Sequence, residues 1–209
     1  MSENPYQLPD LHIKNGPPTD GFFLWQPDKS YLILGRSNNS EESLIQSKVS
    51  EDKIDVMQRP SGGETVILSP KMLIIAAQLP ITKGITSRSY FTFCNDFIIA
   101  ALQNLGVQNL STRGISDISI GEKKILGSAI YRGTNTVFYH AVLNISEDIS
   151  LISKYIKHPK REPDYRNGRP HDEFVTSLNR EGYSLKPEHI AEELAKVSGL
   201  PQRLQNLAL

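Results

Sequence analysis

The chain is poor in cysteine: Cys94 is the only one among 209 residues, which excludes an intramolecular disulfide. This usage is typical of a reducing compartment, and we expect a cytoplasmic protein. The sequence also lacks any run of about 18 apolar residues, the length that a membrane-spanning helix needs. The N-terminal segment has no apolar centre of the kind found in signal peptides. We therefore expect no membrane partner.

The sequence also has no excess of positive or negative charge. The 23 Lys and Arg residues balance the 23 Asp and Glu residues, so the formal net charge is zero. A nucleic-acid-binding domain is normally strongly basic, and we therefore expect no nucleic-acid partner. The sequence contains no Walker loop, GxGxxG or HExxH motif, and no Cys/His cluster with zinc spacing. No metal ligand is assigned.

The apolar patterns predict an α/β (α+β) fold, in which helices pack on a mixed, largely antiparallel sheet. Residues 1–20 hold four prolines and little apolar periodicity, which predicts a loosely ordered N-terminal arm. The chain length fits a single domain. We accordingly expect residues 21–209 to form one domain, without an accessory C-terminal domain.

Local signals predict the individual elements. A Pro-Asp turn between residues 22–26 and 30–35 predicts a hairpin. Apolar residues three and four apart predict a helix over 87–107, and two short turns between three alternating runs predict an antiparallel meander over 115–145. The polar segment 157–173 is too long for a simple connection, so we expect it to be functional or disordered.

The stretch RPSGGETV, residues 59–66, places two adjacent glycines between two strand-like runs. Adjacent glycines let the backbone pass close to a ligand or to another chain. A strained turn would have the same composition. Taken alone, this loop leaves both interpretations open.

The stretch KKILGSAIYR, residues 123–132, combines a lysine with small residues. Strand alternation predicts Lys124 and Ser128 on one face, and Gly127 and Ala129 on the other. A lysine beside small residues can reach over a ligand, and its ammonium suits a phosphate or a developing oxyanion. A solvated lysine that follows a turn is the alternative.

Three further residues carry chemistry. His140 lies in the middle of an apolar strand. It could be a hydrogen-bonded core residue or a site residue, and both interpretations stay open. Asp117 is predicted to point inward, and Lys124 across the hairpin is the obvious partner for its charge. Cys94 falls on the apolar face of the predicted helix, so we expect a buried core thiol.

Four segments, taken in order, resemble the lipoate–protein ligase branch of the biotin/lipoate ligase superfamily. They are GRSNN (35–39), QRPSGGETV (58–66), SDISIGEKKILGSAIYR (116–132) and YHAVLNISEDISLISKYI (139–156). Each motif alone is weak, but four in the right order are specific, and the resemblance spans about residues 22 to 178.

The resemblance implies a biotin/lipoate ligase-like catalytic domain. Such a domain forms or uses lipoyl-adenylate, made from lipoate and ATP with Mg²⁺, and transfers the lipoyl group to a lysine of a carrier lipoyl domain. The implied partners are a lipoyl carrier protein and, as a candidate, a separate accessory-domain protein.

The resemblance also implies roles for individual residues. Lys124 would contact the acyl carbonyl and the adenylate phosphate, and Asp117 would orient that lysine or the incoming amine. The residues implied to bind substrate or adenylate are Arg59, Ser61, Gly62, Gly63, Thr65, Gly127, Ser128, Ala129 and His140. The segment 157–173 is rich in positive charge, and Arg166 and Arg169 are predicted to meet an acidic carrier.

Departures from the family pattern leave alternatives open. Glu64 stands where the family has a third glycine, and Leu68 and Ser69 replace a His-Asp pair. These changes favour transfer over independent activation of lipoate. They also leave open a non-catalytic ligase-fold protein that binds a carrier domain or an acyl-adenylate. An octanoyl transferase ranks third, since segment 157–173 lacks the cysteine nucleophile of that group. The preferred acyl chain, the carrier and the oligomeric state stay open.

Overall fold

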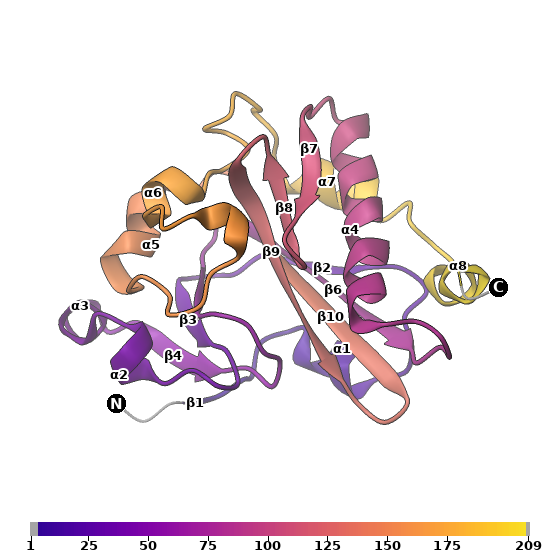
Figure 1. The fold of residues 1–209 in the computed structure, drawn as a ribbon, viewed down its shortest axis with the longest axis horizontal. Helices are drawn as coiled ribbons and strands as arrows, with labels where there is room; N and C mark the ends of the chain where they lie inside the picture. Colours follow the sequence, from indigo (N-terminus) through magenta and orange to yellow (C-terminus); the bar gives the residue numbers. More distant parts are fainter. Residues whose placement is uncertain (1–3, 208–209) are drawn as a thin grey trace.

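The structure is a computed structural model that describes residues 4–207. It contains two sheets, a smaller one beside the N-terminus and a larger one that carries the three longest strands (Figure 1). The smaller sheet has the order β1 (Asn4–Pro5), β4 (Asp55–Gln58), β3 (Tyr31–Leu34), β5 (Val66–Leu68). The pairs β1–β4 and β3–β4 are parallel, whereas β3–β5 is antiparallel.

The larger sheet has six strands, and every pair in it is antiparallel. Its order is β2 (Phe23–Trp25), β6 (Met72–Pro80), β10 (Thr136–Asn144), β9 (Lys123–Arg132), β8 (Asp117–Ile120), β7 (Leu110–Arg113). The strands β8, β9 and β10 confirm the predicted meander. The hairpin predicted from residues 22–26 and 30–35 is wrong, because β2 and β3 pair in different sheets. A turn signal marks a reversal of the chain but does not choose the partner of each strand.

The longest helix, α4 (Ser87–Asn104), packs on the larger sheet and confirms the helix predicted over 87–107 (Figure 1). The Thr86 side chain caps it by accepting a hydrogen bond from the Ser89 amide. Cys94 is fully buried on the inner face of α4, as predicted, and burial raises the pKa of its thiol. The thiolate form is therefore disfavoured.

The N-terminal segment is packed, so residues 4–20 correct the prediction of a loosely ordered arm. Strand β1 pairs with β4, and the short helix α1 (Leu11–Asn15) contacts β6. Tyr6 and Leu8 are buried in the cluster that lies between the two sheets. The prolines limit regular hydrogen bonding in this segment, but they do not prevent burial of the apolar side chains between them.

The remaining helices lie in two groups on opposite sides of the molecule as it is drawn in Figure 1. They are α2 (Ser40–Ser43), α3 (Gln46–Asp52), α5 (Ile149–Tyr155), the 3₁₀ turn η1 (Asp164–Arg166), α6 (His171–Phe174), α7 (Pro187–Leu194) and α8 (Leu200–Asn206). Helix α7 packs on α4, and α8 packs on β6. Within residues 4–207, no helix is both long enough and apolar enough to cross a membrane.

Candidate active site

Two adjoining cavities open where the loop 59–66 meets strands β8 and β9. The larger one, of about 890 Å³, has the more polar lining of the two, formed by residues of that loop, of 37–43, of 114–117 and of 156–171. The smaller one, of about 130 Å³, has a mainly apolar lining that includes Ile33, Val66, Leu68, Ile74 and Val142. Gly63, Glu64 and Ser116 line both, so the two cavities meet at these residues.

Arg59 holds the loop 59–66 in shape. Its side chain is buried and donates from Nη1 to the Ile33 carbonyl (3.2 Å) and from Nη2 to the carbonyls of Gly62 and Glu64 (2.8 Å each). Burial lowers the pKa of Arg59 to about 10. Within residues 4–207 its Nε has no hydrogen-bond partner. The wall of the smaller cavity therefore carries a cation with an unused donor.

The two glycines of this loop serve different purposes. Gly63 has a φ of 90°, a backbone conformation that side-chain-bearing residues rarely adopt. A Cβ on Gly62 would meet nothing within 4 Å, so this residue faces open space. Gly35 lets the loop approach β3, since a Cβ there would lie 1.9 Å from the Gly63 carbonyl oxygen. Gly63 is therefore required by its backbone angle, whereas Gly62 is exposed and lines neither cavity.

A β-bulge in β9 places Lys124 on the same face as Gly127. Ser119 pairs with Lys124 and Ile118 pairs with Leu126, which leaves Ile125 as an extra residue on β9. A Cβ on Gly127 would lie 2.8 Å from Lys124 Nζ. Lys124 and Gly127 consequently share a face, and the simple alternation predicted from the sequence, with these two residues on opposite faces, is wrong.

Lys124 and Asp117 form the predicted ion pair, with 2.8 Å between Nζ and Oδ1. Asp117 is buried and accepts a second hydrogen bond at Oδ2 from the Tyr165 hydroxyl (2.8 Å). Asp117 lines the larger cavity, whereas Gly127 lines the smaller one. Lys124 itself lines neither cavity, but its ammonium pairs with a lining residue of the larger one and lies next to a lining residue of the smaller one.

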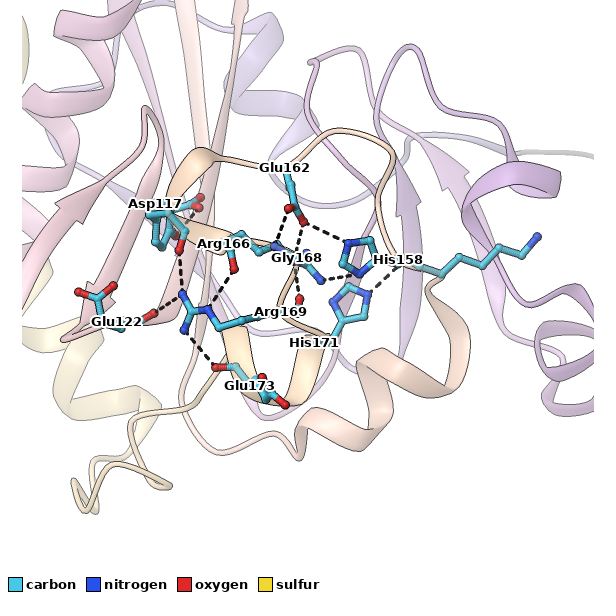
Figure 2. Close-up of polar contacts among 11 residues, drawn as sticks. Asp117, Glu122, His158, Glu162, Arg166, Gly168, Arg169, His171 and Glu173 are labelled. Carbon is cyan, nitrogen blue, oxygen red and sulfur yellow. Dashed lines mark hydrogen bonds and ion pairs between the residues drawn. The ribbon is translucent and has the colours of Figure 1, made fainter.

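The segment 157–173 lies against the larger cavity and is tied together by its own polar side chains (Figure 2). Glu162 accepts a hydrogen bond from the Gly168 amide (2.8 Å) and contacts His158 Nε2 (3.1 Å). The bond from the Gly168 amide is the main reason why the pKa of Glu162 is lowered. Burial lowers the pKa of His171, which contacts the Lys157 carbonyl.

The two arginines predicted to meet a carrier have most of their donors engaged inside this segment (Figure 2). Arg166 is 4% exposed, and its Nε donates to the Arg169 carbonyl (2.9 Å). Arg169 donates to the carbonyls of Tyr165 (2.9 Å), Arg166 (3.0 Å) and Glu122 (3.1 Å). The burial of Arg166 contradicts its predicted place on a docking surface. The sequence gives the charge of an arginine, but it does not show which carbonyls accept hydrogen bonds from its guanidinium.

His140 connects three segments that are far apart in the sequence. Its Nε2 lies 2.6 Å from Ser61 Oγ in the loop 59–66. Its Nδ1 lies 3.3 Å from Oδ2 of Asp10, which precedes α1. Tyr6 donates from its hydroxyl to Asp10 Oδ1 at 2.7 Å. Burial is the main reason why the pKa of His140 is lowered, and it favours a neutral ring.

The other predicted site residues divide into two groups. Thr65 is buried in the lining of the larger cavity, and within residues 4–207 its Oγ1 has no hydrogen-bond partner. Ser128 lines the smaller cavity and donates to the Ser116 carbonyl (2.7 Å). Ala129 lies opposite His140 in the sheet but does not line either cavity. Lys124, Ser61, Gly62 and Arg169 also line neither cavity, whereas Arg166 lines the larger one and the remaining predicted residues line one or both.

Sequence reasoning missed Asp10 and Tyr165. Asp10 stands at the N-cap of α1, but its side chain makes no capping hydrogen bond, because it is engaged by Tyr6 and His140. A short prolyl segment gives no local signal for a contact with a strand 130 residues later. Tyr165 lies in a polar loop, where its contact with Asp117 depends on tertiary folding alone.

Potential metal ligands are sparse in the described part of the chain. No group of three or more His, Cys, Asp or Glu side chains there is placed to hold a metal ion. Mg²⁺ commonly binds through one or two carboxylates together with substrate phosphates. Glu64 and Asp117, which line the polar cavity, fit that mode only together with a nucleotide.

Comparison with known proteins agrees with this geometry. Residues 11–198 match the family model described as the lipoyl protein ligase A/B catalytic domain. The chain is 30% identical over 145 residues to lipoate–protein ligase 1 of Staphylococcus aureus, an alignment that covers 69% of this chain. It covers 43% of that relative, so the chain spans less than half the length of the curated protein.

Two solved structures show the same fold at low identity. One is an archaeal lipoylation system, a bi-partite lipoate protein ligase and its E2 lipoyl domain from Thermoplasma acidophilum. The TM-score is 0.75 at 18% identity, over 90% of this chain and 73% of that chain. The other is lipoate-protein ligase A bound with ATP, with a TM-score of 0.69 at 19% identity, over 83% and 68% of the two chains. With the family model matching most of its length, this chain belongs to the lipoyl protein ligase A/B catalytic-domain family.

Proposed function

We propose that this domain is a lipoate–protein ligase or lipoyltransferase. It forms or uses lipoyl-adenylate and transfers the lipoyl group to one lysine of a carrier lipoyl domain. Family membership supports this proposal, as does the S. aureus relative named lipoate–protein ligase. Neighbours in complex with ATP and with an E2 lipoyl domain indicate the nucleotide and the class of carrier.

The observation that carries the proposal is the contact of the Lys124 ammonium with Asp117, which lines the larger and more polar cavity, and with Gly127, which lines the smaller and mainly apolar one. An acyl-adenylate has the same division, with an apolar chain on one side and a nucleotide on the other. With the chain in the smaller cavity and the nucleotide in the larger one, the mixed anhydride would lie at the lysine. A fixed ammonium there stabilises negative charge as it develops on the carbonyl and phosphate oxygens.

In the transfer step the amine nitrogen of the carrier lysine bonds to the acyl carbon. The bond between that carbon and the phosphate oxygen breaks, and AMP leaves with the electron pair. The amine loses a proton. We assign the Asp117 carboxylate, which pairs with Lys124, as the acceptor of that proton. Holding both reactants in place and offsetting the phosphate charge provide the rate gain.

The buried charge of Arg59 is an argument for an anionic ligand at this site. The buried Arg59 guanidinium hydrogen-bonds within residues 4–207 only to backbone carbonyls, and the Glu64 carboxylate offsets part of its charge without forming an ion pair. Such a charge is costly unless an anion approaches it. Arg59 lines the smaller cavity together with Gly63 and Glu64, and its buried Nε has no hydrogen-bond partner in residues 4–207. A lipoate carboxylate or an adenylate phosphate at this junction would offset the charge.

The experiment separates activation from transfer. The protein is incubated with apo lipoyl domains and either synthetic lipoyl-adenylate or lipoate with Mg²⁺ and ATP, and the carriers are weighed intact by mass spectrometry. We expect lipoylation from the adenylate. Lipoylation in the second arm as well would add independent activation, whereas its absence there would restrict the domain to transfer.

Two outcomes would replace the proposal. Tight binding of adenylate or carrier, without transfer to any carrier, would favour the non-catalytic ligase-fold protein. Acyl transfer from an octanoyl thioester donor would favour the octanoyl transferase. Cys94 could not serve as nucleophile in that case, because it is fully buried with a raised thiol pKa.

A further inference from the structure

Four side chains form a continuous buried chain of hydrogen bonds beneath the loop 59–66. The order is Tyr6 hydroxyl, Asp10 carboxylate, His140 imidazole and Ser61 hydroxyl, with separations of 2.7, 3.3 and 2.6 Å. All four side chains are less than 9% exposed, and Asp10 is fully buried. Because buried polar groups need specific partners, the protons in this chain have only a few possible arrangements.

The chemistry of each group fixes the direction of the chain. A carboxylate only accepts hydrogen bonds, so Tyr6 donates to Oδ1 of Asp10 and His140 donates to Oδ2 from Nδ1. A neutral imidazole carries one proton, which is then on Nδ1, and Nε2 becomes an acceptor. Ser61 must consequently donate its hydroxyl proton to Nε2. Among the charged groups near His140, Asp10 favours a protonated ring and Arg59 disfavours it.

We infer that Asp10 is a positioning residue of the candidate active site, which acts through the tautomer of His140. By holding the ring as the Nδ1–H form, Asp10 makes Ser61 a fixed donor and anchors the loop 59–66 to β10. The Ser61 carbonyl accepts from the Arg36 amide at 2.9 Å, so the same residue also ties the loop to the turn after β3. The part of this inference that concerns ligand binding rests on the function proposed above.

The inference assigns Ser61 a specific state. Its hydroxyl proton is committed to His140, so the side chain cannot at the same time donate to a carboxylate or phosphate. Contacts of this residue with an anionic ligand would have to come from its backbone amide. With Asn in place of Asp10, the ring could donate from Nε2 instead, and the Ser61 hydroxyl would be free to turn.

The tautomer can be tested without any ligand. The protein is labelled with ¹⁵N-histidine, and the His140 signals are identified as those that a His140→Gln variant lacks among the five histidines of the chain. At neutral pH we expect a protonated Nδ1 and an unprotonated Nε2. A proton on Nε2, or on both nitrogens, would overturn the inference whether or not the protein transfers lipoate.

The functional part is tested by a double-mutant cycle on the affinity for a non-hydrolysable lipoyl-adenylate analogue. Asp10→Asn should weaken binding roughly tenfold, as expected for disturbing one charge-assisted buried hydrogen bond. In a Ser61→Ala background the same exchange should have little effect, because no hydroxyl remains to be positioned. Additive losses would show that Asp10 does not act through Ser61 and would overturn the functional part of the inference.

Tyr6→Phe provides a second variant in case Asp10→Asn does not fold. It removes one donor to the carboxylate and leaves the contact between Asp10 and His140 in place. We expect a smaller loss of affinity, with the His140 tautomer unchanged. A Tyr6→Phe protein that changes the tautomer would contradict the assigned direction of the chain. Failure of the wild type to bind the analogue, with the expected tautomer present, would count against the proposed function and not against this inference.

Discussion

At the scale of single residues, two adjacent lysines differ in what their side chains face. Lys124 forms its ion pair with buried Asp117, and its side chain is 27% exposed. Lys123 pairs with Glu181 at 3.6 Å, and its side chain is 44% exposed. Exposed ion pairs contribute little, whereas a preorganised charge beside a reacting bond lowers the barrier strongly. The two positions therefore form a matched test of function.

Replacing Lys124 by Met keeps much of the apolar stem and removes the charge. We expect transfer from synthetic lipoyl-adenylate to fall on the order of 10²-fold or more, because the developing oxyanion loses its fixed cation. Lys123→Met is the control and should transfer at close to the wild-type rate. Rates are measured by intact mass of the carrier. A Lys124→Met protein as fast as the control would remove this lysine from the mechanism.

Gly127→Ala tests the position of the same ammonium. The added Cβ would lie 2.8 Å from both Cε and Nζ of Lys124, and the end of this flexible side chain would have to move. We expect a melting temperature close to that of the wild type, with transfer reduced roughly tenfold or more by the misplaced charge. Gly133→Ala, in the turn between β9 and β10, is the control for an added methyl. Unchanged transfer in a folded Gly127→Ala protein would mean that this lysine need not lie over the strand.

At the scale of elements, the segment 157–173 differs most from its sequence interpretation. Its positive charge suggests a docking loop, but Arg169 binds backbone carbonyls of the protein itself, and Arg166 binds a carbonyl, the Glu162 carboxylate and the His158 ring. Tyr165 then joins the segment to Asp117, and so to Lys124. The segment thus forms one wall of the polar cavity, and its first role is to hold that wall in place.

Arg169→Ala removes the bonds that fasten this segment to the carbonyl of Glu122 and to its own backbone. We expect faster limited proteolysis within 157–173 and weaker binding of lipoyl-adenylate, since the cavity wall loosens. Arg161→Ala, an exposed residue of the same segment, is the control. An unaltered proteolysis rate combined with a raised KM for the carrier alone would instead support the docking role predicted from the sequence.

At the scale of the whole molecule, the candidate site lies where the two sheets and the N-terminal segment meet. Tyr6 and Asp10 come from the N-terminal segment, the loop 59–66 connects two strands of the smaller sheet, and His140 belongs to the larger sheet. The cluster between the sheets packs directly beside these groups. Folding and site assembly are therefore coupled, and the protonation of His140 should influence the stability of the whole domain.

The pH dependence of stability follows from the lowered pKa of His140. The unfolded histidine titrates near pH 6.5, so the neutral buried ring contributes fully above that pH. The contribution is lost as pH falls through the lower pKa of the folded state. We expect the free energy of unfolding in urea to decrease between about pH 7.5 and about pH 5. The decrease should be smaller in His140→Gln, and unchanged in His189→Gln, whose ring is exposed. An identical decrease in all three proteins would assign the effect to other groups.

Much of the fold and part of the site could be predicted from local patterns. The meander and α4 have regular apolar spacing, and a period of two or of about 3.6 residues is set by the backbone alone. The pairing of Lys124 with Asp117 follows from adjacent strands joined by a short turn. The order of four motifs also indicated the family, because the residues that carry its chemistry lie in short local segments.

Contacts between distant segments could not be predicted in this way. Strand pairing put β2 and β3 into different sheets, and a single bulge at Ile125 brought Gly127 to the face on which Lys124 lies. Asp10 reaches His140 only because the N-terminal segment packs between the sheets. The sequence by itself determined the local elements and the motif residues, since backbone periodicity and residue chemistry act over a few neighbours. Tertiary structure alone decided which of these residues meet, because burial and hydrogen bonding across the two sheets depend on the packing of the entire chain.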